Sequence, residues 1–168
     1  KRVDDGNPLI LRDYDRCIFC YRCTRICNEL EQAHAIAPGG RGFDSRITTF
    51  GEMPLQESPC TFCGQCINTC PTGALADLPR VGKAKASEIE KSVNTTCPYC
   101  GTGCTLNLDV AKGHVVGVRP DFGSPVSRGS LCVKGQFGWE FIQDEGRLKT
   151  PLVRRGGKGG RLEPASWD

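Results

Sequence analysis

The sequence predicts an α+β protein made of two small units, on three observations. The first is an internal repeat, because residues 17–27 and 60–70 have the same spacing of four cysteines, with Phe19 and Phe62 at matching places. The second is a pair of expected β-hairpins in the second half of the chain. The third is composition, since 21 glycines and 11 prolines in 168 residues favour turns around small cores over one large core.

The elements of the first half follow from the repeat. Each half of the repeat is expected to form a cysteine loop followed by a short helix. A pseudo-twofold axis is expected to relate the two halves. The helices are expected over Asn28–Ala37, which a Pro-Gly-Gly sequence ends, and over Ile67–Leu75. Phe43–Phe50 has strand character between them. Ala84–Val93 combines helix formers with mixed charges and is expected to be an exposed joining helix.

The second half is expected to be richer in strands. Two strands of a hairpin are expected at Thr105–Val110 and Val115–Arg119. Leu131–Ile142 is expected to become helical near its glycine. Leu152–Arg155 and Arg161–Glu163 indicate a second hairpin across a glycine-rich turn.

The cysteines carry the chemistry of this chain. They form a first run, a second run and a third group: Cys17, Cys20, Cys23 and Cys27; Cys60, Cys63, Cys66 and Cys70; Cys97, Cys100, Cys104 and Cys132. Each run has the spacing C-x2-C-x2-C-x3-C, and Cys-Pro ends the second, as in bacterial two-cluster ferredoxins, where the fourth cysteine binds the other cluster. We therefore predict three [4Fe–4S] sites: Cys17, Cys20, Cys23 and Cys70; Cys60, Cys63, Cys66 and Cys27; Cys97, Cys100, Cys104 and Cys132.

Two other uses of cysteine fit the sequence less well. A disulfide framework requires an oxidising compartment, and the chain contains neither a signal peptide nor a long apolar run. Structural zinc usually takes two C-x2-C pairs, or cysteines together with histidines. We therefore expect a cytoplasmic iron–sulfur protein with no direct membrane insertion.

The net charge does not indicate a nucleic-acid partner. The formal charge is +3, but each oxidised [4Fe–4S] cube with four thiolates contributes about −2, so the loaded protein carries roughly −3. The sequence also lacks a Lys/Arg-rich stripe with interleaved aromatic residues. We expect no nucleic acid among its partners.

Four segments resemble the amino-terminal part of molybdopterin-containing oxidoreductases: residues 96–104 (TCPYCGTGC), 127–135 (SRGSLCVKG), 147–154 (RLKTPLVR) and 164–168 (PASWD). The preceding two-cluster module is similar to that of formate dehydrogenase alpha subunits. The module also resembles that of iron-only hydrogenases. The large iron–sulfur subunit of NADH dehydrogenase is another relative, with a less similar cluster spacing. The combination of this two-cluster module with the four segments that follow it favours formate dehydrogenase.

The resemblance implies a division of the chain. Residues 1–78 are expected to form a two-[4Fe–4S] ferredoxin-like domain, and residues 79–95 a partly helical linker. Residues 96–150 are expected to form a small β-rich [4Fe–4S] domain of the molybdopterin oxidoreductase type. Residues 151–168 are expected to begin a truncated pterin-binding catalytic domain, with a helix starting at Ser166.

The resemblance also implies an electron relay rather than a catalytic site. It places no catalytic residue in this segment. Molybdopterin guanine dinucleotide with molybdenum or tungsten belongs to the missing remainder of the subunit. Lys134 matches a lysine between the third cluster and a pterin. The implied partners are iron–sulfur and flavin subunits of a larger complex. Two alternatives stay open: a stand-alone ferredoxin-like carrier or adaptor, and the equivalent segment of another pterin oxidoreductase or of a hydrogenase-linked complex.

Overall fold

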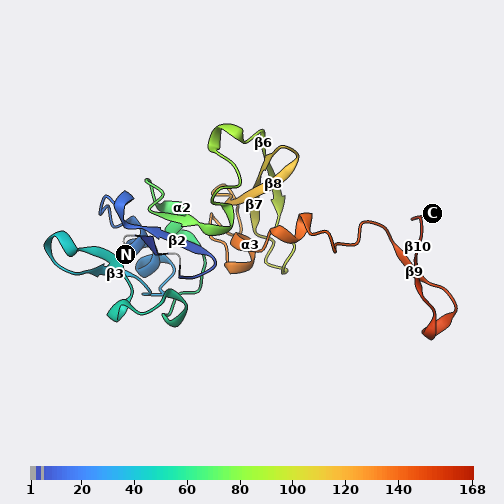
Figure 1. Cartoon of the computed structure of the whole chain (residues 1–168), viewed down its shortest axis with the longest axis horizontal. Coiled ribbons are helices and arrows are strands. Elements are labelled where there is room, and N and C mark those ends of the chain that lie inside the picture. The colour runs from blue at the N-terminus through green and yellow to red at the C-terminus, as the bar shows by residue number, and fades with distance from the viewer. Residues whose placement is uncertain (1–2, 5) are drawn as a thin grey trace.

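Short helices and small antiparallel sheets make up the protein. The structure is a computed structural model that describes residues 3–4 and 6–168. The described residues form two three-stranded sheets and two hairpins. Two packed units lie side by side, and an arm extends from the second one to the carboxyl end (Figure 1). The observed class is therefore α+β, as the sequence predicted.

The sheet of the first unit joins the two cysteine runs. Strand β2 (Ile10–Asp13) precedes the first run and pairs with β1 (Val3–Asp4) on one side. On its other side it pairs with β5 (Leu75–Asp77), which follows the second run. A separate hairpin of β3 (Ala37–Gly39) and β4 (Arg46–Thr48) lies between the runs. The ends of the repeat are thus hydrogen-bonded to each other.

A short helix starts inside each cysteine run. Helix α1 (Arg22–Arg25) continues directly into a π-helical turn, η2 (Ile26–Leu30), and contacts α2 (Gln65–Thr69). The helix expected over Asn28–Ala37 is therefore wrong in its bounds, and so is the one expected to reach Leu75, which opens β5. Positive φ angles of 51° at Gln32 and 50° at His34 are incompatible with a continued helix.

The second unit is built on a three-stranded sheet. Strand β7 (Thr105–Ala111) and strand β8 (His114–Pro120) form the predicted hairpin. Strand β6 (Lys91–Thr96) pairs with β7 along its whole length. The exposed helix expected over Ala84–Val93 is therefore wrong, because Val and Thr in this segment favour a strand once a partner strand is present.

Helix α3 (Val133–Phe137) packs into both units. Phe137 belongs to the buried core of the first unit, together with Ile10 and Leu75. Trp139, two residues further on, belongs to the second core with Val118. Because one short segment contributes to both cores, the two units are held as one body.

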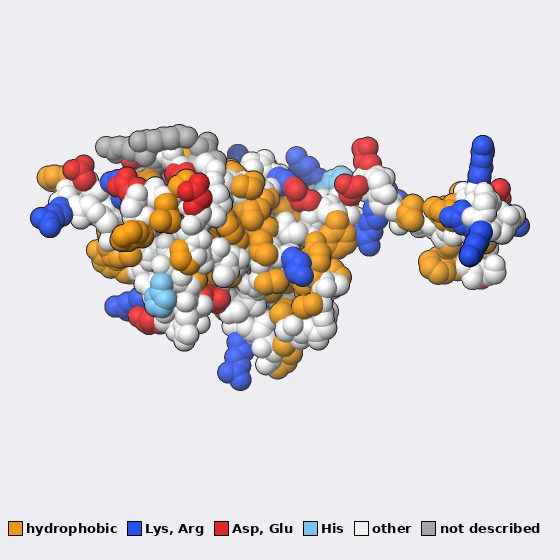
Figure 2. All heavy atoms as spheres, turned by 90° about the horizontal axis from the view of Figure 1, so that it is seen from below, with side chains coloured by type: hydrophobic (Ala, Val, Ile, Leu, Met, Phe, Trp, Pro, Cys, Tyr) orange, Lys and Arg blue, Asp and Glu red, His pale blue; other side chains and the backbone are white. Residues whose placement is uncertain are grey.

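The carboxyl-terminal arm stands away from the packed units. It is a hairpin of β9 (Leu152–Arg154) and β10 (Leu162–Pro164), as predicted. The expected helix at Ser166 is not formed. Figure 2 shows the arm as a separate lobe, and hydrophobic side chains mixed with charged ones over the larger body.

The remaining short elements are 3-10 turns: Tyr14–Arg16, Gly42–Asp44, Phe50–Glu52, Leu55–Glu57, Leu78–Arg80, Ala86–Glu88, Glu140–Gln143 and Gly157–Gly159. None of the helices described here is both long enough and apolar enough to cross a membrane.

A buried ion-pair group ties the segment after β5 to the second sheet. The Asp109 carboxylate, fully buried on β7, accepts hydrogen bonds from Arg119 Nε and Nη2. Arg80 Nη2 lies 2.8 Å from Asp109 Oδ2. Burial alone would raise the pKa of Asp109, but the hydrogen bonds from Arg119 and Ser92 and the charge of Arg80 outweigh it, and the pKa falls below its usual value.

We expect Asp109→Ala to destabilise the folded protein by about 1–3 kcal/mol, because it removes the buried acceptor of hydrogen bonds and ion pairs from two partly exposed guanidinium groups. The midpoint of urea unfolding of the cluster-loaded protein measures this loss. Glu163→Ala is the control, since it removes an exposed ion pair with Arg155 and should cost no more than about 1 kcal/mol. Equal losses for the two variants would contradict a structural role of the buried group.

Candidate iron–sulfur sites

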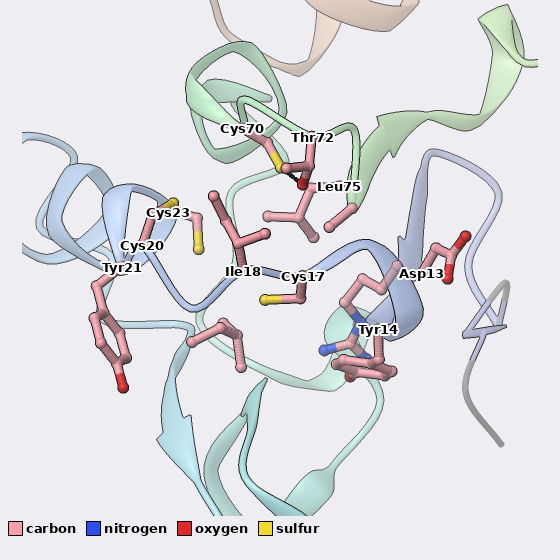
Figure 3. A pocket seen from close by; sticks show the side chains of 13 residues that line it. Asp13, Tyr14, Cys17, Ile18, Cys20, Tyr21, Cys23, Cys70, Thr72 and Leu75 are labelled. Carbon is pink, nitrogen blue, oxygen red and sulfur yellow. Dashed lines mark hydrogen bonds between the residues drawn. The ribbon is translucent and has the colours of Figure 1, made fainter.

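The first cavity gathers four cysteines from both runs (Figure 3). Cys17 and Cys20 come from the loop before α1, Cys23 lies in α1, and Cys70 follows α2. Ile18 and Leu75 contribute apolar side chains to the lining. Thr72 Oγ1 lies 3.8 Å from Cys70 Sγ. The cavity therefore brings together the four cysteines of one predicted set, the exchanged Cys70 included.

The second cavity has the complementary lining. It contains the remaining four cysteines of the two runs: Cys27, Cys60, Cys63 and Cys66. Its other lining residues include Ile10, Ile36 and Leu55 of the buried core. Each cavity thus takes three cysteines from one run and the fourth from the other run, because α1 and α2 lie against each other.

The two cysteine loops have the same unusual backbone. The φ angle is 53° at both Phe19 and its repeat partner Phe62. The next matched pair, Tyr21 and Gly64, has φ angles of 59° and 76°. Left-handed residues among right-handed ones turn successive backbone N–H groups into a concavity that holds anions, as at many iron–sulfur sites. Strain of this kind on non-glycine residues is typical of functional sites.

Burial makes these thiols hard to ionise without a metal. It raises the pKa of Cys23 to about 11, against a hydrogen bond from the Thr24 backbone, and raises the pKa of Cys66 well above its usual value. Burial alone would also raise the pKa of Cys70, but hydrogen bonds from backbone groups around Thr72 outweigh it and lower this pKa. Buried thiolates require cations beside them, and the iron atoms of a cluster would meet that need.

The third group lies on the second unit and is more open. Cys97 is buried against Leu131 and Trp139, whereas Cys100 and Cys132 are exposed. The Cys97 N–H donates to the Cys104 carbonyl oxygen at 2.8 Å, which closes the loop. Cys132 occupies the N-cap position of α3, without a side-chain hydrogen bond to the helix. Cys97 lines a small cavity with Leu106 and Trp139, and the other three cysteines of the group do not line that cavity.

The predicted Lys134 lies beside this third group. It is exposed in the first turn of α3, two residues after Cys132. Hydrogen bonding with Thr102 is the main cause of the lowered pKa of Cys100, and the charge of Lys134 adds to that effect. The ammonium group is therefore close enough to act on a sulfur of the cysteine loop.

The sulfur positions suit a cluster better than a single ion. Among the described residues, no three His, Cys, Asp or Glu side chains come together closely enough to hold one metal ion. A zinc ion needs its sulfur ligands at about 2.3 Å, whereas a cube of four irons spreads its four thiolates around a larger volume. Four thiols around one cavity fit the larger group.

A buried polar contact joins the second cavity to α3, and sequence reasoning did not predict it. Gln65 Nε2 donates to the Gly129 carbonyl oxygen at 2.8 Å. Asn68 Nδ2 donates to Gln136 Oε1 at 2.9 Å, and Gln136 Nε2 lies 3.4 Å from Asp77 Oδ2. Burial raises the pKa of Asp77 to about 6. The loop of the second run is thus bonded to the segments before and after Cys132.

We expect Gly64→Ala to destabilise the protein more than Gly73→Ala does. Both glycines have positive φ, 76° and 67°, so each substitution costs about 1–2 kcal/mol of backbone strain. Only at Gly64 would the added Cβ lie 2.5 Å from Gln136 Cγ, while nothing lies within 4 Å at Gly73. The clash should add about 1–3 kcal/mol, which the midpoints of urea unfolding of the loaded variants measure.

A second substitution tests whether contact with Gln136 causes the additional loss of stability in Gly64→Ala. Gln136→Ser shortens the side chain that the new methyl group meets, so it should recover part of the loss in Gly64→Ala and none of the loss in Gly73→Ala. Equal losses in the two single variants, without recovery, would contradict the close contact between the units.

Comparison with known proteins identifies both units as iron–sulfur domains. Residues 7–76 match the family model of the NADH-quinone oxidoreductase subunit 3, ferredoxin-like domain. Residues 90–144 match the family model of the molybdopterin oxidoreductase Fe4S4 domain. The chain therefore combines two domains of families that occur in iron–sulfur oxidoreductases, and these families indicate [4Fe–4S] clusters. More closely, the chain joins a ferredoxin-like domain of the NADH-quinone oxidoreductase type to an Fe4S4 domain of the molybdopterin oxidoreductases.

Individual relatives align along nearly the whole chain. A subunit of the NADH-quinone oxidoreductase of Rhizobium meliloti (strain 1021) is 40% identical over 96% of this chain. A protein named "Putative formate dehydrogenase SH0748" of Staphylococcus haemolyticus (strain JCSC1435) is 30% identical over 98% of it. "Probable oxidoreductase YjgC" of Bacillus subtilis (strain 168) is 27% identical over 98%.

The relatives qualify the sequence interpretation in two respects. The chain spans only 18% of the Rhizobium protein and 20% of the other two. The NADH-quinone oxidoreductase protein also has the higher identity, although the cluster spacing had favoured formate dehydrogenase over it. The comparisons support the oxidoreductase class. They do not identify the substrate.

Proposed function

We propose that this chain is the electron-relay part of a formate dehydrogenase that oxidises formate or reduces CO2 at a molybdenum or tungsten pterin centre. Its three [4Fe–4S] sites are formed by Cys17, Cys20, Cys23 and Cys70; by Cys60, Cys63, Cys66 and Cys27; and by Cys97, Cys100, Cys104 and Cys132. A [4Fe–4S] cluster takes up and releases single electrons while its ligands stay in place.

The lining of the first two cavities is the observation that carries this proposal. Each cavity is lined by the four thiols that one cube requires, and the two cavities together account for all eight cysteines of the two runs. The apolar residues of both cavities exclude water, and the paired loops direct backbone N–H groups toward the negative sulfur atoms.

The contacts between the units support an order for the relay. The second cavity lies next to α3, through Gln65, Asn68 and Gln136, and α3 starts at Cys132. Electrons would then pass from the third group to the second cavity and from there to the first cavity. In this proposal the pterin centre, molybdopterin guanine dinucleotide with molybdenum or tungsten, lies beside Lys134. The exposed ammonium would then stand between that centre and the third cluster, where its positive charge would favour uptake of an electron by the cluster.

The proposal places the protein in a larger assembly. Its partners are iron–sulfur and flavin subunits that exchange electrons at the first cavity, and its location is cytoplasmic. Formate dehydrogenase is favoured by relatives of that name that align over 98% of the chain. Such a relay binds no nucleic acid and inserts no segment into a membrane.

A second candidate is the corresponding part of an NADH-quinone oxidoreductase. The 40% identity to the Rhizobium protein and the match of residues 7–76 favour it. In that case the relay receives its electrons from NADH through a partner subunit, and the second unit keeps its cluster without a pterin centre in use.

One experiment separates the candidates. The complex purified around this protein is mixed anaerobically with formate or with NADH, and EPR records the reduced clusters, while metal analysis measures molybdenum and tungsten. Reduction by formate, with one of these metals present, is the expected result. Reduction by NADH alone, without either metal, would favour the second candidate. Reduction by neither, with iron present, would indicate a stand-alone carrier.

A further inference from the structure

A buried arginine lies between the first and the second cavity. Arg12, on β2, lines both of them. Its side chain is only 8% exposed, in contrast to that of Arg16, which is 65% exposed near the same cysteine run. A guanidinium stays charged at any ordinary pH. One fixed positive charge therefore faces both groups of thiols from inside the protein.

The hydrogen bonds of Arg12 are incomplete. Its Nε and Nη2 donate to Asp4 Oδ2 of the neighbouring strand β1. The third nitrogen, Nη1, is buried and has no hydrogen-bond partner among the residues that the structure describes. Leaving a buried donor unpaired is unfavourable, and more so when the group is charged, because its hydrogen bond to water is lost without a replacement. An ion pair with Asp4 alone does not account for this arrangement.

The surroundings show what kind of acceptor fits. Arg12 lines both cavities together with their cysteines, with Cys17 in the first cavity and Cys60 in the second. The thiolates and sulfide ions of a cluster are negative hydrogen-bond acceptors, and protein hydrogen bonds to them tune cluster potentials. A donor that is buried, charged and unpaired beside such a cavity matches that role.

We propose that Arg12 Nη1 donates a hydrogen bond to a sulfur atom of one of the two clusters that it faces, and that it raises the reduction potential of that cluster more than that of the other. This inference rests on the proposed ligation of the clusters. Each reduction adds one negative charge to the site. A fixed cation with little water around it stabilises the reduced form more than the oxidised form.

The first test is the substitution Arg12→Gln, measured by EPR-monitored redox titration of the full chain with its clusters assembled. The reduction equilibrium constant of one ferredoxin-like cluster should fall about tenfold, which is 59 mV for a one-electron couple. Arg16→Gln is the matched control, because it removes the same charge from an exposed position, where solvent and salt screen it. Iron and sulfide assays establish that all three clusters are present.

The second test detects the contact directly in the wild-type protein. Protein labelled with guanidinium-15N arginine is reduced, and pulsed electron–nuclear double resonance is recorded on the signals of the two ferredoxin-like clusters. A 15N coupling is expected in the wild-type protein and should vanish in labelled Arg12→Lys. Full cluster content with unshifted potentials in Arg12→Gln, or no 15N coupling in the wild-type protein, would overturn the inference. Failed cluster assembly in the wild-type chain would instead contradict the proposed function.

Discussion

Replacing Cys70 with alanine is expected to release the cluster of the first cavity and to leave that of the second cavity in place. Cys70 belongs to the second run in sequence, but in the structure its sulfur lines the first cavity. Losing one of four thiolates opens the cube to loss of iron. The three cysteines that remain in the first cavity should then react with iodoacetamide, while the cysteines of the second cavity stay protected. Peptide mass spectrometry of the alkylated native protein measures this.

The reciprocal substitution sharpens the test. Cys27→Ala belongs to the first run, yet it should expose Cys60, Cys63 and Cys66 to alkylation. Thr72→Ala is the control for Cys70, because it changes a contact of that sulfur and keeps the thiol itself, so all three clusters should remain. If each variant instead exposed the cysteines next to it in sequence, the crossed ligation would be wrong.

The gathering of the eight cysteines could be predicted from the sequence because ligand spacing is a local property. Two residues between cysteines fix a loop that wraps one cluster, and the longer spacing before Cys27 or Cys70 turns that residue toward the neighbouring site. The structure brings these thiols together as predicted. The third group was harder, since Cys132 is distant from Cys97 in sequence and no local rule places α3.

The bounds of the helices could not be predicted, because tertiary contacts set them. Asn28–Ala37 contains good helix formers, but left-handed residues at Gln32 and His34 end the helix early. Lys91–Thr96 becomes a strand only because β7 is there to pair with it. Local propensity is a weak guide wherever a partner segment decides the conformation.

The role of Arg12 was also beyond sequence reasoning. In the sequence it precedes the first run by five residues and resembles the exposed arginines that follow. Its burial depends on the pairing of β2 with β1 and β5, which are distant segments. Likewise, Gln136 joins the two units only after α3 has packed against α2. Contacts of this kind have no periodicity or spacing that marks them in advance.

Removal of iron should unfold the first unit and leave the sheet of the second unit in place. The buried core of the first unit is small, and most of the partly buried apolar groups packed against it are cysteines that face the two cavities. Without metal, these cavities lose the bonds that join the two runs, and a unit of this size has little other burial to hold it. Among the described strands of this unit the longest is β2, with four residues, and its partner β5 has three.

Hydrogen exchange with mass spectrometry measures this after anaerobic chelation of iron. Amides of β2, α1, α2 and β5 should lose their protection. Those of β7 and β8 should keep most of theirs, because these strands have seven residues each and bury an apolar face of their own. Asp109→Ala supplies the contrast, since it weakens the second sheet without touching a cysteine. If the apoprotein kept the protection of the first unit, apolar packing rather than metal would be what folds it.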